Sequence, residues 1–93
     1  MDDMDWRRFA AEDPIRWRGD PEDDCVCYWA GLLLRAEQMD EDSWWWAVYD
    51  GDKQVNSSDN EPFSHRPEPC RSGEQARAAA ERAARRWLGL MER

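Results

Sequence analysis

The chain has 93 residues and a net charge of −8, from 21 acidic and 13 basic side chains, which suits one small domain and argues against non-specific binding to polyanions such as nucleic acid or anionic membranes. No apolar run approaches the roughly 18 residues needed to cross a membrane, and the acidic start Met1–Asp5 does not resemble a secretory signal. Three cysteines, an odd number, do not suggest a disulfide framework, so we expect a cytoplasmic protein. Arginine and alanine are frequent and lysine is rare, which is typical of a bacterial genome rich in G and C, so we expect a bacterial host cell.

The N-terminal segment predicts a short helix followed by an acidic arm. Trp6 and Phe9 share one face of a helix over residues 3–12. Pro14 ends this helix, because the residue before a proline is pushed out of the α region. Ile and Trp alternate at residues 15–17, and we expect them to pack as an extended arm.

The middle of the chain predicts antiparallel strands. Residues 25–38 begin with β-branched and aromatic side chains, which favour a strand. A helix over residues 29–38 is an alternative, because Ala, Leu and Glu also suit a helix. Residues 44–50 form the strongest strand pattern, and Asp50-Gly51 is a hairpin signal. Residues 53–58 then pair back as a polar edge strand.

A long C-terminal helix is predicted over residues 73–91. Ser72 is a good N-cap, and Gln75 completes a capping box. The segment is rich in alanine and has no proline, which favours a helix. Trp87 is expected to plug the far end of the contact between helix and sheet. The apolar stripe at helical spacing comprises Ala76, Ala80, Ala83, Trp87, Leu90 and Met91.

These elements predict an α+β fold, in which a three-stranded antiparallel sheet carries the long C-terminal helix on one face. A short N-terminal helix completes it. The predicted single domain has four segments: N-terminal helix and acidic arm (1–24), antiparallel sheet (25–58), Pro-rich loop (59–71) and C-terminal helix (72–92).

The tryptophan-rich strand raises the question of what covers the second face of the sheet. Alternate strand residues point to opposite sides, so Trp44 and Trp46 share one face while Trp45 and Tyr49 share the other. One helix covers only one face. The second face is covered either by the N-terminal segment or by another molecule, and exposed Trp45 and Tyr49 would then anchor a partner.

The cysteines and the single histidine allow one further hypothesis. Cys25, Cys27, His65 and Cys70 have the side-chain types of a zinc site, but their spacing departs from the familiar pattern, and free cysteines are commonly buried. We therefore expect no metal or other cofactor. A zinc-stabilised interaction module remains a second alternative.

Acidic turns are the strongest candidates for a binding surface. Solvated turns are the simplest explanation, but carboxylates held at the edge of a rigid sheet can also imitate a run of phosphates. The chain has no evident nucleophile–base set and no Gly-rich phosphate loop, so we expect no enzymatic activity. The predicted partner-binding acids are Asp20, Glu22, Asp23, Asp24, Asp40, Glu41 and Asp42.

The arrangement of residues 43–51 (Ser-Trp-Trp-Trp-Ala-Val-Tyr-Asp-Gly) and 72–81 (Ser-Gly-Glu-Gln-Ala-Arg-Ala-Ala-Ala-Glu) resembles small phage and mobile-element proteins that carry a short antiparallel sheet followed by a helix. Some acidic members of that population are anti-CRISPR or other anti-defence proteins. The resemblance is architectural, covers roughly residues 26–90 and implies an inhibitory binding role. We therefore expect a binding protein that blocks the basic DNA- or RNA-binding groove of a host complex by charge mimicry. The alternative is a homodimerising domain that buries its aromatic sheet face.

Overall fold

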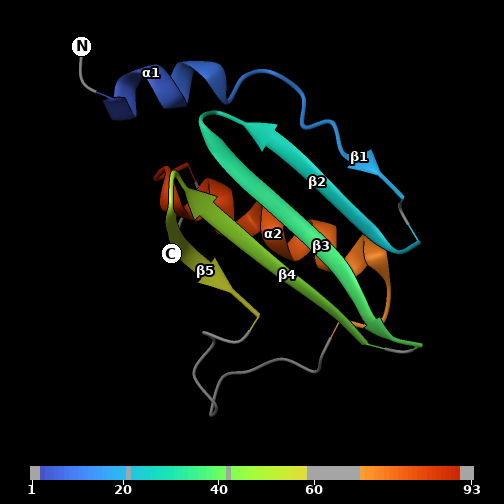
Figure 1. Ribbon diagram of the computed structural model, residues 1–93. Coiled ribbons are helices and arrows are strands. Elements are labelled where there is room, and N and C mark those ends of the chain that lie inside the picture. The colour runs from blue at the N-terminus through green and yellow to red at the C-terminus, as the bar shows by residue number, and fades with distance from the viewer. Residues whose placement is uncertain (1–2, 21, 42, 59–69, 91–93) are drawn as a thin grey trace.

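The computed structural model describes residues 3–20, 22–41, 43–58 and 70–90. It confirms an α+β fold with a short N-terminal and a long C-terminal helix, but the prediction of three strands was wrong. Five strands form one antiparallel sheet in which each strand lies beside its neighbour in sequence (Figure 1). The elements are α1 (Asp3–Ala10), β1 (Arg18–Gly19), β2 (Asp24–Trp29), β3 (Leu32–Asp40), β4 (Ser43–Asp50), β5 (Lys53–Ser57) and α2 (Gly73–Trp87).

The segment predicted as one strand over 25–38 is a hairpin of β2 and β3. Ala30 and Gly31 form its turn with positive φ angles of 53° and 79°, as a tight two-residue hairpin turn requires. A straight strand of this length would also outrun its partners in so small a sheet. The helix considered for residues 29–38 does not form, because the pairing with β2 and β4 satisfies the backbone of β3 on both sides.

Of the two remaining strand pairs, one was not predicted and one was. The sheet begins earlier than predicted, because β1 in the acidic arm pairs with β2 through Arg18 and Gly19. The hairpin predicted at Asp50-Gly51 is confirmed between β4 and β5, and Gly51 has a φ of 62°.

Helix α2 begins as predicted and ends sooner. Ser72 caps it by accepting a hydrogen bond from the backbone N–H of Gln75 at 3.1 Å. The helix ends at Trp87 rather than at residues 91–92, because Gly89 takes a φ of 75°. The N–H groups of Gly89 and Leu90 then donate to the carbonyls of Arg86 and Arg85, which is a Schellman ending.

One face of the sheet, the covered face, forms the core with α2. The helix lies over β3 and β4 (Figure 1) and packs its small alanines closely against them. Leu88 fills the end of this contact; the prediction that Trp87 would do so was wrong, because Trp87 remains 40% exposed. The covered face comprises Cys25, Cys27, Trp29, Leu32, Leu34, Ala36, Trp44, Trp46 and Val48.

Helix α1 lies across one end of the sheet (Figure 1). Polar side chains attach it to the rest of the fold. Arg7 donates two hydrogen bonds to the Asp50 carboxylate, at 2.5 and 2.7 Å, and Arg8 donates one to the Leu88 carbonyl at 2.9 Å. Trp6 and Phe9, the two large apolar residues of the predicted helix face, are 55% and 75% exposed.

Candidate functional site

The second face of the sheet, the open face, carries aromatic, aliphatic and charged side chains together. Antiparallel register places Leu33 between Tyr28 and Tyr49, and Glu37 beside Trp45. Tyr28 is 81% exposed, whereas Trp45 and Tyr49 are half-buried by their neighbours. The open face comprises Asp24, Val26, Tyr28, Leu33, Arg35, Glu37, Trp45, Ala47 and Tyr49.

The N-terminal arm does not cover this open face. Trp17 donates its indole N–H to Glu81 of α2 at 3.1 Å, and Trp29 on the covered face donates to the Asp13 carbonyl at 2.9 Å. Ile15 and Trp17 both pack against the core. The arm therefore lies beside α2 on the covered face, and no described helix or strand covers the open face.

Arg35 stands in the middle of the open face with acidic neighbours. Its guanidinium lies 3.5 Å from Asp24 and 3.8 Å from Glu37. The Nε of Arg35 and one carboxylate oxygen of Asp24 are buried without a hydrogen-bond partner among the described residues. Buried polar atoms in this state favour a partner that supplies the missing bonds.

The meander topology brings the two acidic turns to the same end of the sheet, although they are far apart in sequence. The β1–β2 turn carries Asp20, Glu22 and Asp23, which are exposed, and Asp24, which is half-buried. The β3–β4 turn carries the exposed Glu41 at the same end (Figure 1). We call these five residues the acidic end. The side chain of Asp40, and Asp42 as a whole, lie outside what the structure describes.

The two predicted aromatic anchors lie at different places on the open face. Trp45 pairs with Glu37, which in turn pairs with Asp24, so Trp45 lies next to the acidic end. Tyr49 lies four residues further along β4, roughly 13 Å away at strand geometry. The structure therefore joins Trp45 to the predicted acids and places Tyr49 toward the other end.

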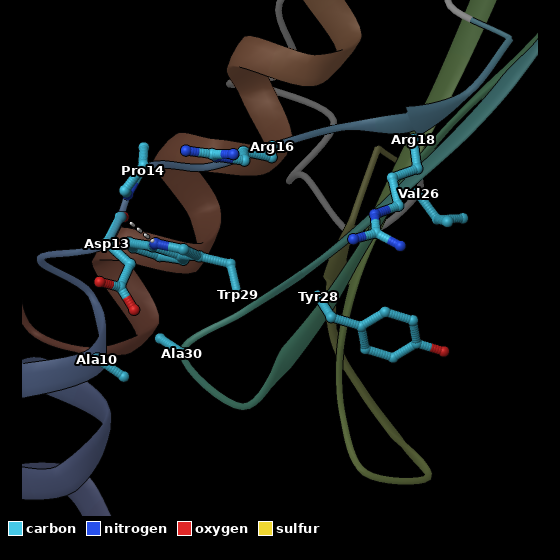
Figure 2. Close-up of a pocket in the computed structure, with 9 residues that line it drawn as sticks. All are labelled: Ala10, Asp13, Pro14, Arg16, Arg18, Val26, Tyr28, Trp29 and Ala30. Carbon is cyan, nitrogen blue, oxygen red and sulfur yellow. Dashed lines mark hydrogen bonds between the residues drawn. The ribbon is translucent and has the colours of Figure 1, made fainter.

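A groove of about 620 Å³ runs between the N-terminal arm and the edge of β2 (Figure 2). Asp13, Arg16 and Arg18 line it from the arm, and Tyr28 and Trp29 line it from β2. We call it the edge groove. Sequence reasoning missed it, although the alternation of Ile15, Arg16, Trp17 and Arg18 separates two apolar side chains from two arginines.

The predicted zinc ligands do not come together in the described part of the chain. Cys25 and Cys27 are buried on the covered face, while the Cys70 carbonyl accepts the backbone N–H of Trp44 at 2.8 Å beside β4. His65 lies outside the described residues, and no described group of three His, Cys, Asp or Glu side chains could hold a metal ion. Burial raises the pKa of the Cys27 and Cys70 thiols, which keeps them in the protonated form that binds metal poorly.

Among the described residues, no helix has both the length and the apolar character to span a bilayer. Comparison with protein-family models, with curated proteins and with solved structures gave no match. The candidate site therefore rests on the three surfaces themselves: the open face, the acidic end and the edge groove.

Proposed function

We propose that this protein is a non-enzymatic binding protein whose acidic end occupies a basic DNA- or RNA-binding groove of a partner complex, as anti-defence inhibitors do. The observation that carries the proposal is that the meander gathers two acidic turns at one end of a rigid sheet. Carboxylates on neighbouring hairpin turns lie roughly 10 Å apart, at twice the strand spacing. They present a fixed negative surface to Arg and Lys side chains.

The exposure of the individual acids supports this role. Glu22, Asp23 and Glu41 point their charges to solvent, and none of them has an ion pair among the described residues. Asp24 contributes less, because Arg35 already neutralises part of its charge. Asp20 has a structural task as well, since its carboxylate accepts the Glu22 backbone N–H at 2.9 Å.

Trp45 supplies the second component of the proposed interface. A large aromatic beside the acidic end gives a partner apolar area to bury, and tryptophan is a frequent hot-spot residue in interfaces. The carboxylates then steer the encounter and set its dependence on salt, while Trp45 slows dissociation.

The test compares two double variants of equal net charge. Glu22→Gln with Asp23→Asn removes two charges from the acidic end, and Glu12→Gln with Asp52→Asn removes two exposed charges elsewhere. Tagged proteins capture nucleic-acid-handling complexes from a bacterial lysate with CRISPR and restriction systems, and each captured complex is assayed for DNA and RNA binding.

The proposal expects the wild type and the control to retain the complex at low salt, release it at high salt and inhibit its nucleic-acid binding. The acidic-end variant should lose roughly tenfold or more in affinity, as for several charge contacts at once. Equal behaviour of the two variants, or capture without inhibition of nucleic-acid binding, contradicts the proposal.

A second candidate, homodimerisation through the open face, is favoured by the 81% exposure of Tyr28 on a sheet face with no described cover. Burial of this apolar area is insensitive to salt. Sedimentation of the wild type should then show a doubled mass at low and high salt. Trp45→Ala should lower this mass, and a monomer at all salt concentrations rejects the candidate.

A further inference from the structure

The edge groove carries a pair of arginines whose guanidiniums make no ion pair with a described residue. Arg16 and Arg18 are exposed and line the groove opposite Tyr28 and Trp29 (Figure 2). Neither guanidinium has an ion pair with a described residue, whereas Arg7 and Arg85 each have one and Arg35 has two. Two unpaired guanidiniums in one groove of an acidic protein favour a ligand with carboxylates.

The same groove exposes hydrogen-bonding groups of the sheet edge. Along a strand of an antiparallel sheet, successive residues point their backbone N–H and C=O groups to alternate neighbouring strands. The Asp20 N–H donates to the Asp24 carbonyl, so the backbone groups of Asp24, Val26 and Tyr28 all point toward β1. The pairing of β1 ends at Arg18, opposite Val26. The N–H and C=O of Tyr28 therefore face the groove without a described backbone partner.

The cause of this gap lies in the core. Beyond β1 the arm leaves the plane of the sheet, because Ile15 and Trp17 pack into the covered face and Trp17 bonds to Glu81. The arm thereby stands off the edge of β2 at Tyr28. A gap with one free donor and one free acceptor fits an extended peptide, which adds to a sheet edge through its own backbone.

We propose that the edge groove binds an extended segment of a partner protein that carries one or two carboxylate side chains. Arg18 pairs with Val26, so its side chain lies on the same side of the sheet as the Tyr28 ring. A peptide residue opposite Tyr28 points its side chain to that same side. An Asp or Glu at this position therefore meets the Arg18 guanidinium while its backbone bonds to Tyr28.

The neighbouring charges limit the occupant to a short acidic segment. Asp13 lines the groove at one end, and Asp20 follows Arg18 by two residues at the other. These carboxylates repel a longer run of negative charge, such as a nucleic-acid strand. The favoured ligand is a segment in which apolar residues flank the acids. This inference is independent of the proposed function, because it concerns different residues and a ligand of opposite charge.

The test uses end-blocked, fluorescently labelled peptides of alternating valine and glutamate, measured by fluorescence anisotropy with the full chain. The matched probes are the valine–glutamine peptide and a valine–glutamate peptide methylated at its central backbone nitrogens. The glutamate peptide should bind. The glutamine peptide should bind about tenfold more weakly, as for the loss of charge-assisted hydrogen bonds, and the methylated peptide should also bind more weakly.

Protein variants locate the site. Arg16→Gln and Arg18→Gln should each weaken binding of the glutamate peptide about three- to tenfold, while the control Arg86→Gln, at an exposed position of α2, should not. All three should keep the circular dichroism and unfolding midpoint of the wild type. The Glu22/Asp23 double variant should bind the peptide at least as well as the wild type.

Three results overturn the inference: no binding of the glutamate peptide at any soluble concentration, equal binding of the glutamate and glutamine peptides, or Arg16 and Arg18 variants that match the Arg86 control. Displacement of the peptide by a short single-stranded oligonucleotide that binds more tightly overturns the choice of a peptide ligand. None of these results bears on the acidic end, so the two proposals fail separately.

Discussion

Both faces of the sheet carry aromatic residues, but these residues are buried on one face and more exposed on the other. On the covered face Trp44 and Trp46 are 7% and 5% exposed beneath α2, whereas the open face leaves Tyr28 81% exposed. Trp45 stands between two buried tryptophans in sequence and yet projects from the opposite side. The alternation of a single strand thus separates side chains that build the core from side chains that project from the open face.

A high aromatic content therefore does not by itself indicate a core or a binding site. The bulky residues of the covered face are buried beneath α2, whose buried residues are alanines and one glycine. The open face has no such layer in the described part of the chain, and its charged Arg35, Asp24 and Glu37 mark it as a surface.

The largest effect is expected from truncating adjacent tryptophans. Trp46→Ala should lower the free energy of unfolding by about 3–5 kcal/mol, because it leaves a cavity under α2. Trp45→Ala should cost only about 1–2 kcal/mol, since that side chain is half-buried. Urea unfolding followed by circular dichroism measures both, and similar losses would contradict the distinction between the faces.

Adjacent leucines on β3 allow the same comparison between the two faces, with a smaller expected difference in the free energy of unfolding. Leu34 is fully buried on the covered face, and Leu34→Ala should cost about 3 kcal/mol. Leu33 is half-buried on the open face, and Leu33→Ala should cost about 1 kcal/mol or less. Thermal unfolding of the two variants in the same buffer tests this, and a greater loss for Leu33→Ala would indicate that the open face is covered in solution.

Asp50 tests a region that belongs to neither face. Hydrogen bonds from Arg7 hold the pKa of Asp50 below its usual range. A carboxyl group whose pKa is lowered by folding stabilises the folded state at pH values above its pKa in the unfolded chain, which is about 4. This contribution is lost as the pH falls through its pKa in the folded state. Asp50→Asn should cost about 1 kcal/mol at neutral pH and remove that part of the acid dependence. Near-ultraviolet circular dichroism, recorded as the pH is lowered, should show this loss of acid dependence for Asp50→Asn. The control Asp52→Asn should behave like the wild type.

The smallest effect on stability is expected at the acidic end. Glu22→Gln with Asp23→Asn should change the free energy of unfolding by no more than about 0.5 kcal/mol, because both side chains are exposed and unpaired among the described residues. A rise in stability at low salt would fit relief of repulsion within the turn. A loss well above that limit would show that the acids support the fold rather than present a surface.

The sequence predicted the local elements that depend on nearby residues. The Ser72 cap, the Asp50-Gly51 hairpin and the division of Trp44 and Trp46 from Trp45 all follow from patterns within a few positions. The Ala30-Gly31 turn was missed because a continuous apolar run masks it and alanine is uncommon at positive φ. The early end of α2 follows from Gly89, whose positive φ is a local signal that the apolar stripe obscured.

The α+β class, the start and amphipathic pattern of the C-terminal helix and the acidic character of the turns could be predicted from the sequence, because these depend on composition and spacing. Three features depended on the tertiary structure: the N-terminal arm packs beside α2 and leaves the open face without a described cover, two distant acidic turns share one end of the sheet, and Arg16 and Arg18 line one groove with Tyr28. Each of these depends on strand order and on competition between apolar side chains for one core. Both are set by contacts between residues far apart in the chain.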